Sequence, residues 1–477
     1  MAETISADYL VIGAGAMGMA FVDTLLADTN ATVAIVDRYH CPGGHWTTAY
    51  PFVRLHQPSA FYGVNSKHLG QDAIDKVGWN SGMHELATCH EVCAYFSQVM
   101  YQHFLPSGRV TYFPKCDYTG DGKFHSIITA RTFQVGKGTR IVDATFMRVT
   151  VPSMVPPAYD VARDVDLVTP NDLTKISRQY ANYTVVGAGK TGIDTCLWLL
   201  AMGIDPSQIV WIMPRDSWLL DRSAYQPGPL FADTRHGNLQ AQREAIMAAT
   251  SVTDLFKRLD ASGQLLRLSD KVWPTMFRCA TVSAAELEQI RKIETVVRMG
   301  RVVRIGKDEV VLERGSHRPN PDTLYIDCSA DGLAKIGPVP VFKGNQITLQ
   351  SVRTCQQVFS AAFISHVEST YDDEKVKNEL CRPIPHPHEG TDWLMVAILN
   401  LRNRLRWEAE PKTVAWLGQA RLNWDTLPPL SEDPEERRAE LQTRAKLIEA
   451  LAEKLQKLLG DMPEKEAEKA KAQIARP

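Results

Sequence analysis

The sequence lacks the features of several protein classes. Its nine cysteines are dispersed and include no C-x-x-C pair, so we expect reduced thiols in a cytoplasmic protein. No apolar run approaches the roughly 20 residues of a membrane-spanning helix, and the chain starts without the basic and apolar segments of a secretory signal. Lysine and arginine number 53 against 55 aspartate and glutamate, giving a net charge of −2. This balance argues against nucleic-acid or anionic-membrane partners.

What the sequence does contain is a glycine turn near its start, in the stretch VIGAGAMG. Gly13, Gly15 and Gly18 form a G-x-G-x-x-G pattern between a predicted buried strand and a predicted helix. The first glycine permits a tight turn, the second lets the backbone approach a pyrophosphate, and the third lets the helix pack on the strand. Asp37 ends the next predicted strand, where a carboxylate accepts hydrogen bonds from a ribose diol, and Arg38 follows it. We call this turn the first cradle and predict that it binds a dinucleotide.

A second glycine turn, the second cradle, follows in the stretch VVGAGKTG. The predicted strand after it ends in WIMPRD, with no acid where one would meet a ribose 2′-hydroxyl. Arg215 lies there instead, and an arginine accommodates a 2′-phosphate, so NADPH is favoured over NADH. Arg222 is a second candidate for this contact. The predicted NADPH-binding residues are Gly187, Gly189, Lys190, Thr191, Gly192 and Arg215.

The loop after the first cradle carries a glycine pair, Gly43 and Gly44, and then Trp46, Tyr50 and Arg54. In this order the motifs resemble those of the two-dinucleotide-binding-domain flavoproteins, and most of all the flavin-containing monooxygenase-like group. The resemblance implies FAD at the first cradle, with Trp46 near the isoalloxazine ring or the substrate channel. The alternative for Trp46 is a core aromatic.

A later stretch, Leu324–Gly332, resembles the strand and turn that contact FAD in this superfamily. The resemblance implies an acid at a ribityl or phosphate-side group, either Asp327 or Asp331. A helix predicted to start near Thr354 would direct its N-terminal partial charge at the flavin. The implied FAD-binding residues are Gly13, Gly15, Gly18, Asp37, Arg38, Gly44, His45, Trp46, Asp331 and Gly332.

Two cradles in one chain predict hydride transfer from a nicotinamide to a flavin. Disulfide reductases of this superfamily place a cysteine pair just past the glycines, and Cys41 has no such partner. The resemblance therefore implies an NADPH-dependent monooxygenase that transfers oxygen from a flavin 4a-hydroperoxide to a small organic substrate. The F-x-G-x-x-x-H motif of the group has no counterpart before the second cradle. Two alternatives stay open: an NAD(P)H-dependent flavin reductase or dehydrogenase with another acceptor, and a redox-silent flavin-binding interaction protein.

The sequence indicates no catalytic residue firmly. The weak candidates are Trp46, Arg54 and Asn65. The substrate pocket is expected where the flavin, the inserted domain and residues 221–294 meet, with His56 and Gln57 as further weak candidates beside Arg54. No metal site is predicted, because the histidines of RPIPHPHEG and the cysteines of CHEVC are typical of surface loops and buried helix faces.

These motifs predict an α/β fold with two Rossmann-like dinucleotide-binding domains, the NAD(P)H domain being inserted in a split FAD domain. The predicted boundaries are 1–175 and 319–372 for the FAD domain, 176–318 for the NADPH domain with a helical insertion at 221–294, and 373–477 for a helical C-terminal region. In the tail, Leu441, Ile448, Leu455 and Met462 recur every seven residues. Such a stripe packs on its own domain or pairs two copies in a homodimer.

Overall fold

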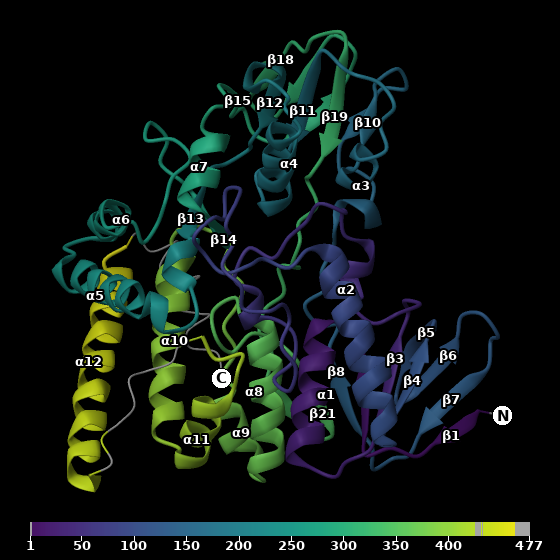
Figure 1. The fold of residues 1–477 in the computed structure, drawn as a ribbon, viewed down its shortest axis with the longest axis vertical. Coiled ribbons are helices and arrows are strands. Elements are labelled where there is room, and N and C mark those ends of the chain that lie inside the picture. The colour runs from purple at the N-terminus through teal and green to yellow at the C-terminus, as the bar shows by residue number, and fades with distance from the viewer. Residues whose placement is uncertain (1, 425–430, 432, 463–477) are drawn as a thin grey trace.

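The computed structural model describes residues 2–424, 431 and 433–462, and its elements form three parts (Figure 1). One part holds the first cradle, and a second part at the far end of the long axis holds the second cradle. A group of helices lies beside them. The predicted α/β fold with two dinucleotide-binding domains is confirmed by this arrangement. Of the predicted C-terminal region 373–477, residues 425–430, 432 and 463–477 lie outside the described residues.

The first sheet carries the first cradle at the carboxyl end of a central strand. Its strand order is β20-β21-β8-β2-β3-β4, and the pairs from β21 to β4 are parallel. The parallel pairing of β2 with β3 requires a crossover helix, and the glycine turn begins it. The strands are β2 (Tyr9–Ile12), β3 (Val33–Asp37), β4 (Val110–Pro114), β8 (Arg140–Asp143), β20 (Phe342–Lys343) and β21 (Gln346–Thr348).

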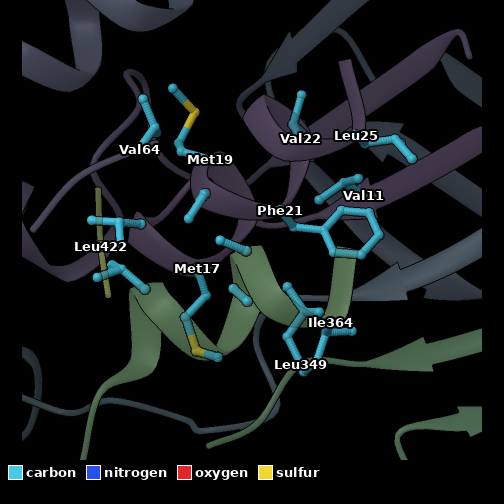
Figure 2. Packing of buried hydrophobic residues seen from close by; sticks show 14 of the residues in the cluster. Val11, Met17, Met19, Phe21, Val22, Leu25, Val64, Leu349, Ile364 and Leu422 are labelled. Carbon is cyan, nitrogen blue, oxygen red and sulfur yellow. The ribbon is translucent and has the colours of Figure 1, made fainter. Parts of the chain in front are cut away.

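Two helices from distant parts of the sequence pack together on one face of this sheet. They are α1 (Ala16–Asp28) and α8 (Gln357–Thr370), and α2 (Cys89–Gln98) lies beside them (Figure 1). Figure 2 shows Met17 and Phe21 of α1 near Ile364 of α8, within one buried apolar cluster. The predicted helix near Thr354 is therefore present and begins at Gln357.

A smaller sheet covers the other face of the first sheet. Its order is β1-β7-β6-β5, and Phe124 stacks on Phe133 within it at 4.9 Å between ring centroids. Both rings belong to a buried cluster with Leu10, Ala34 and Val36 of the first sheet. Because both faces are covered, β2 and β3 are buried and read as continuous apolar runs. The strands are β1 (Glu3–Ile5), β5 (Cys116–Gly120), β6 (Lys123–Ser126) and β7 (Thr132–Val135).

The second sheet is parallel throughout, with the order β10-β19-β11-β12-β15. Its strand β19 lies in the stretch that the sequence analysis assigned to the first domain at 319–372, so the chain returns to the first sheet only at β20. The strands are β10 (Leu167–Val168), β11 (Asn182–Val186), β12 (Ile209–Ile212), β15 (Thr295–Val297) and β19 (Thr323–Asp327). Its helices are α3 (Pro170–Leu173), α4 (Lys190–Ala201) and α7 (Ala284–Ile290).

A four-stranded sheet of order β18-β17-β16-β9 packs against the second sheet through a separate buried cluster. Strands β16 to β18 are antiparallel neighbours. The strands are β9 (Asp160–Val161), β16 (Val302–Ile305), β17 (Val310–Leu312) and β18 (Gly315–His317).

The predicted helical insertion at 221–294 is only partly helical. It contains α5 (Ala232–Ala248), α6 (Val252–Ala261) and α7, but also the strand β14 (Met276–Val282). β14 pairs in parallel with β13 (Ser217–Asp221), which precedes the insertion. The two paired segments lie far apart in sequence. Six of the seven residues of β14 are buried, so the strand shows no alternation of apolar and polar residues that would predict it.

The remaining helices form the third part, beside α8 and α1 of the first part (Figure 1). They are α9 (Glu374–Leu380), α10 (Asp392–Glu408), α11 (Pro411–Gln419) and α12 (Pro434–Gly460). The apolar stripe of the tail lies on α12, and Ile448, Leu451, Leu455 and Leu458 are buried there. Leu451, Leu455 and Leu458 share one buried cluster with residues of α10 and α5 of the same chain, and pairing of two copies through this helix stays a prediction.

The expectation that all cysteines are reduced is wrong, because Cys279 and Cys355 form a disulfide. The two residues are 76 positions apart, so spacing alone cannot reveal the bond. The other seven cysteines are free. Within the described residues, no helix is both long enough and apolar enough to cross a bilayer.

Candidate functional site

The first cradle turns sharply between β2 and α1. Gly13 has a φ of +103°, and a Cβ on it would lie 3.0 Å from Cγ2 of Thr145. A Cβ on Gly18 would lie 2.0 Å from the carbonyl oxygen of Gly13, so the helix can approach the strand only with glycine there. Among the described residues no side chain caps α1, whose first backbone N–H groups are therefore available to an anion.

The glycine pair after β3 folds back onto this cradle. The N–H of Gly43 donates to the carbonyl oxygen of Ala14 at 2.9 Å, and a Cβ on Gly44 would lie 2.9 Å from Cα of Gly15. The sequence analysis expected only a pyrophosphate to approach the backbone of Gly15. In the structure the backbone of Gly44 also approaches it. His45 follows, and burial lowers its pKa to about 4, so its imidazole is neutral at pH 7. The loop forms one wall of the cradle.

Asp37 lies at the end of β3, beside the first cradle. Its Oδ2 accepts from the N–H of Ala14 at 2.5 Å and its Oδ1 from the N–H of Tyr39 at 2.7 Å. Burial raises the pKa of this carboxyl. Each carboxylate oxygen can accept a second hydrogen bond, so the group fits a ribose diol. Arg38 is exposed and pairs at 3.6 Å with Asp117.

The second cradle repeats this geometry but is more open. Gly187 has a φ of +130°, and a Cβ on it would lie 2.4 Å from the carbonyl oxygen of Cys328. A Cβ on Gly192 would lie 2.3 Å from the carbonyl oxygen of Gly187, as at Gly18 in the first cradle. A Cβ on Gly189 would meet no described atom within 4 Å. The helix α4 also begins without a side-chain cap among the described residues, so the turn fits a pyrophosphate.

The loop after the first cradle connects to the helix of the second. Lys190, at the start of α4, forms an ion pair with Asp194, whose other oxygen accepts from the hydroxyl of Tyr50 at 2.7 Å. Phe52 stacks on Trp198 of α4 at 5.0 Å between ring centroids. Tyr50 and Phe52 therefore dock the loop of the first domain on α4 of the second.

The weak catalytic candidates do not converge in the structure. Trp46 is buried in the first core, and its indole N–H donates to the hydroxyl of Tyr62 at 2.7 Å. The side-chain oxygen of Asn65 accepts from the N–H of Leu422 at 3.2 Å, which anchors a distant segment. Arg54 is exposed. None of the three candidates is among the described residues that line the large cavity.

The later turn that the resemblance assigns to FAD lies between the two domains. Asp327, at the end of β19, accepts hydrogen bonds from the backbone of Ser329 and the hydroxyl of Tyr159 at 3.0 and 3.1 Å. The backbone of Gly332, with a φ of +69°, accepts from the N–H of Thr150 at 2.8 Å. This contact joins the chain segments around Thr150 and Gly332, which both run between the two domains.

Asp331 is held in an ionic cluster at the same junction. It pairs with Arg278 of β14 at 3.1 Å and with Lys335 at 3.3 Å. Its assignment to the flavin stays a prediction, since its carboxylate already has two cationic partners.

The sequence analysis missed one segment of the first cradle, residues 143–145. Strand β8 ends at Asp143 beside β2, and Thr145 faces Gly13 across the turn. Oδ1 of Asp143 accepts from the N–H and the hydroxyl of Thr145 at 2.8 and 2.7 Å. The signal was present, because IVDAT is a strand followed by an acid and small residues, as in the later stretch YIDCSADG.

Arg215 follows β12 and reaches the C-terminal region. It donates to Oε2 of Glu389 at 2.8 Å and contacts Nε2 of His388 at 3.0 Å. Nδ1 of His388 faces Arg278 at 2.8 Å. Burial, with Arg278, Lys335 and Arg215, lowers the pKa of His388 to about 4. A neutral imidazole accepts at one nitrogen only, so His388 cannot accept hydrogen bonds from both guanidinium groups.

Arg222 is not available for a 2′-phosphate, although the sequence analysis made it a candidate. Its side chain is 1% exposed and forms a 2.7 Å ion pair with Glu286 of α7. It also donates to the carbonyl oxygen of His56 at 3.1 Å and to Oδ1 of Asn80 at 3.0 Å. These bonds make Arg222 a link between the second domain and two loops of the first.

A large cavity is lined in part by residues of the 221–294 segment, which the sequence analysis gave to the substrate pocket. Its volume of about 730 Å³ lies within the range of small-molecule sites, and α5, α10, α12 and β14 surround it. His56 and Gln57 line it, whereas Arg54 does not. Burial, with Lys190 and Arg222, lowers the pKa of His56 to about 3, so the imidazole of His56 is neutral at pH 7. Gln57 lies 3.4 Å from Gln356, directly before α8.

No family model matches the chain. It is 54% identical over 460 residues to Uncharacterized protein Rv2000 and Uncharacterized protein MT2056 of Mycobacterium tuberculosis (strains ATCC 25618 / H37Rv and CDC 1551 / Oshkosh) and to Uncharacterized protein Mb2023 of Mycobacterium bovis (strain ATCC BAA-935 / AF2122/97). The alignments cover 96% of this chain and 85% of each relative.

Several solved structures of flavin monooxygenases are similar to the chain. Cyclohexanone-bound cyclohexanone monooxygenase in the Rotated conformation is 12% identical, with a TM-score of 0.47 and 77% of this chain and 87% of that chain covered. Oxidized steroid monooxygenase bound to NADP is 12% identical, with a TM-score of 0.46 and coverages of 76% and 85%. The flavin-containing monooxygenase from Stenotrophomonas maltophilia is 14% identical, with a TM-score of 0.40 and coverages of 86% and 99%. At these sequence identities and TM-scores, the structural similarity does not assign an activity to this chain.

Proposed function

This chain belongs to the family of the mycobacterial proteins Mb2023, MT2056 and Rv2000, and we propose that it is a flavoprotein that oxidises NADPH. One observation carries the proposal: two glycine cradles, each at the start of a helix without a side-chain cap among the described residues, follow strands with parallel neighbours in two separate sheets of one chain. A Cβ at Gly18 or Gly192 would overlap a backbone oxygen, which is the fit expected of dinucleotide sites.

The first cradle supports FAD through its own residues. The N–H groups at the start of α1 have no side-chain cap among the described residues and would bind a pyrophosphate, and the Asp37 carboxylate would accept from a ribose diol. The helix α8 begins at Gln357 beside the large cavity and has no side-chain cap among the described residues. Its N-terminal partial charge suits the negative charge that a reduced flavin carries. When bound, FAD supplies the hydride acceptor and the reaction with oxygen.

The second cradle supports NADPH. Gly189 has open space above it, and Tyr50 fixes the neighbouring helix to the loop of the first cradle. Hydride transfer needs the two cofactors close together, and the bond from Tyr50 to Asp194 ties the loop after the first cradle to the helix that follows the second. We propose that the substrate is a small organic molecule in the 730 Å³ cavity, which receives one oxygen atom.

The reaction is tested with full-length protein reconstituted with FAD. The expected result is NADPH oxidation with oxygen uptake, and one atom of labelled dioxygen incorporated into a product from a panel of amines, sulfides and ketones. If NADPH is oxidised with an added electron acceptor and no substrate incorporates labelled oxygen, the protein is a flavin reductase or dehydrogenase and not a monooxygenase. Flavin binding without NADPH oxidation would leave only a redox-silent binding protein.

Arg215 is expected to set the choice between NADPH and NADH. Its guanidinium contacts Glu389 and His388 and is one-third exposed at the end of β12. Arg215→Gln keeps a polar side chain but removes the charge, so the preference for NADPH should fall about tenfold, which corresponds to about 1.4 kcal/mol. Dissociation constants of both nucleotides measure this. Glu389→Gln, which removes the competing carboxylate, should instead strengthen NADPH binding. An unchanged preference in Arg215→Gln would remove the residue from the 2′-phosphate site.

A further inference from the structure

The Cys279–Cys355 disulfide joins two parts of the molecule that lie far apart in sequence. Cys279 belongs to β14, in the segment inserted between the two domains, and Cys355 precedes α8, a helix of the first domain. Their Cα atoms are 6.6 Å apart. The bond therefore fixes the inserted segment to the first domain at the junction described above.

Both cysteines line the large cavity. Cys279 is 8% exposed and Cys355 is half-buried. The other seven cysteines are free, and none of them is among the described residues of the cavity wall. A disulfide reacts only where a thiolate can reach one of its sulfurs along the bond, so access from a cavity is the first requirement for exchange.

The surroundings of the two sulfur atoms are unequal. Cys355 lies two residues before α8, whose N-terminal partial charge stabilises a thiolate. Its Sγ lies 4.0 Å from Nδ1 of His386. Burial, with Arg278 and His388, lowers the pKa of His386 to about 4, so its imidazole is neutral at pH 7. In the tautomer with the proton on Nδ1, this ring donates to the thiolate.

The backbone is strained on both sides of the bond. Cys279 has a φ of +56°, and Thr354, next to Cys355, has a φ of +36°. The left-handed region is costly for residues other than glycine, and especially for a β-branched residue such as Thr354. Seven described non-glycine residues adopt it, and two of them lie at this crosslink. Such strain gathers at functional sites, where the surrounding structure holds it.

The cavity wall also carries charge of mainly one sign. Among the described residues of the wall, Arg235, Arg243, Arg404 and Arg444 carry guanidinium groups, and Asp233 carries a carboxylate. A ligand with carboxylate groups is therefore favoured over a cationic one.

We propose that Cys279 and Cys355 form a thiol–disulfide exchange site, which takes small, carboxylate-bearing thiols that enter the cavity. The substrate thiolate attacks Sγ of Cys279, the S–S bond breaks, and its electron pair leaves on Sγ of Cys355. A second substrate thiolate attacks the substrate sulfur of the mixed disulfide and releases Cys279. Two thiols thus become one disulfide, and their two electrons and two protons reduce the crosslink to two cysteines. The reverse sequence reduces a small disulfide.

This inference goes beyond the proposed function and does not need a bound flavin. The experiment is a redox titration of the full-length, flavin-free protein in native buffers of rising ratio of glutathione to glutathione disulfide. After quenching with N-ethylmaleimide, intact mass should show two further thiols appearing together. Peptide mapping should assign them to Cys279 and Cys355. Appearance of these thiols only after urea is added would overturn the proposal, whatever the outcome with NADPH.

Two single variants test the inequality of the sulfurs. With glutathione disulfide, Cys279→Ser should form a mixed disulfide at Cys355 about threefold faster at pH 7 than Cys355→Ser does at Cys279, because the helix favours the Cys355 thiolate. Added sodium chloride should slow the reaction with anionic glutathione disulfide and speed that with cationic cystamine. Equal rates together with the opposite response to salt would overturn the assigned roles. If the variants fail to fold, the titration of the native protein decides alone.

Discussion

A protein carrying Gly18→Ala is expected to purify without flavin. The new Cβ would fall 2.0 Å from the carbonyl oxygen of Gly13, so α1 must move away from β2. Overpacking of this kind costs about 1–3 kcal/mol, and the displaced helix start no longer presents its N–H groups to a pyrophosphate. We expect the flavin content to fall about tenfold or more, measured by absorbance after release from the purified protein.

The matched change in the second cradle separates the two sites. In Gly192→Ala the Cβ would lie 2.3 Å from the carbonyl oxygen of Gly187, so the clash is of the same kind. This variant should keep its flavin and lose NADPH binding, read by isothermal titration. Gly237→Ala in α5 is the control, because its Cβ would meet no described atom within 4 Å. The control should be neutral or stabilised by up to about 1 kcal/mol. A fully yellow Gly18→Ala protein would refute the flavin assignment.

The cradles could be predicted from the sequence because their geometry is local. Gly13 and Gly18 are five residues apart and meet across a single turn, and the strand and helix on either side have their own apolar patterns. The same holds for Gly187 and Gly192. A pattern of this kind fixes the conformation of the turn and the role of each glycine before any tertiary contact is known.

What the sequence could not show depends on contacts between distant segments. The apolar pattern of β19 is the same in either sheet, and only its pairing with β11 places it in the second. The strand β14 lacks alternation because most of its residues are buried, and its partner β13 lies beyond two helices. The disulfide could not be predicted for the same reason, since the fold brings Cys279 to Cys355 and their spacing in the sequence does not indicate the bond.

The site residues divide in the same way. Asp37 was predictable because it ends the strand after the cradle, whereas the docking of Tyr50 on Asp194 joins segments 144 positions apart. The sequence placed Arg215 first, because it follows the predicted strand after the second cradle, and left Arg222 as a second candidate. In the structure Arg222 is enclosed while Arg215 is one-third exposed, so burial excludes Arg222.

Of the substitutions proposed for this protein, Arg222→Met is expected to lower the free energy of unfolding most. The substitution keeps an apolar stem of similar length but removes the cation that pairs at 2.7 Å with Glu286. The Glu286 carboxylate, 13% exposed, is then left without its cation, and the side-chain oxygen of Asn80 loses its donor. Breaking a buried pair on one side costs about 3–5 kcal/mol, mainly through the charge left behind.

The measurement is urea unfolding followed by tryptophan fluorescence, with a double-mutant cycle to isolate the pair. Glu286→Gln combined with Arg222→Met removes the buried charge, so the double variant should recover part of the loss through a coupling of about 1–3 kcal/mol. Arg131→Gln is the control, since its ion pair with Glu3 is mostly exposed and worth about 1 kcal/mol or less. If Arg222→Met lowers the midpoint no more than the control does, the arginine does not hold the domains together. A large loss with no recovery in the double variant would assign the effect to the bonds with His56 and Asn80 instead.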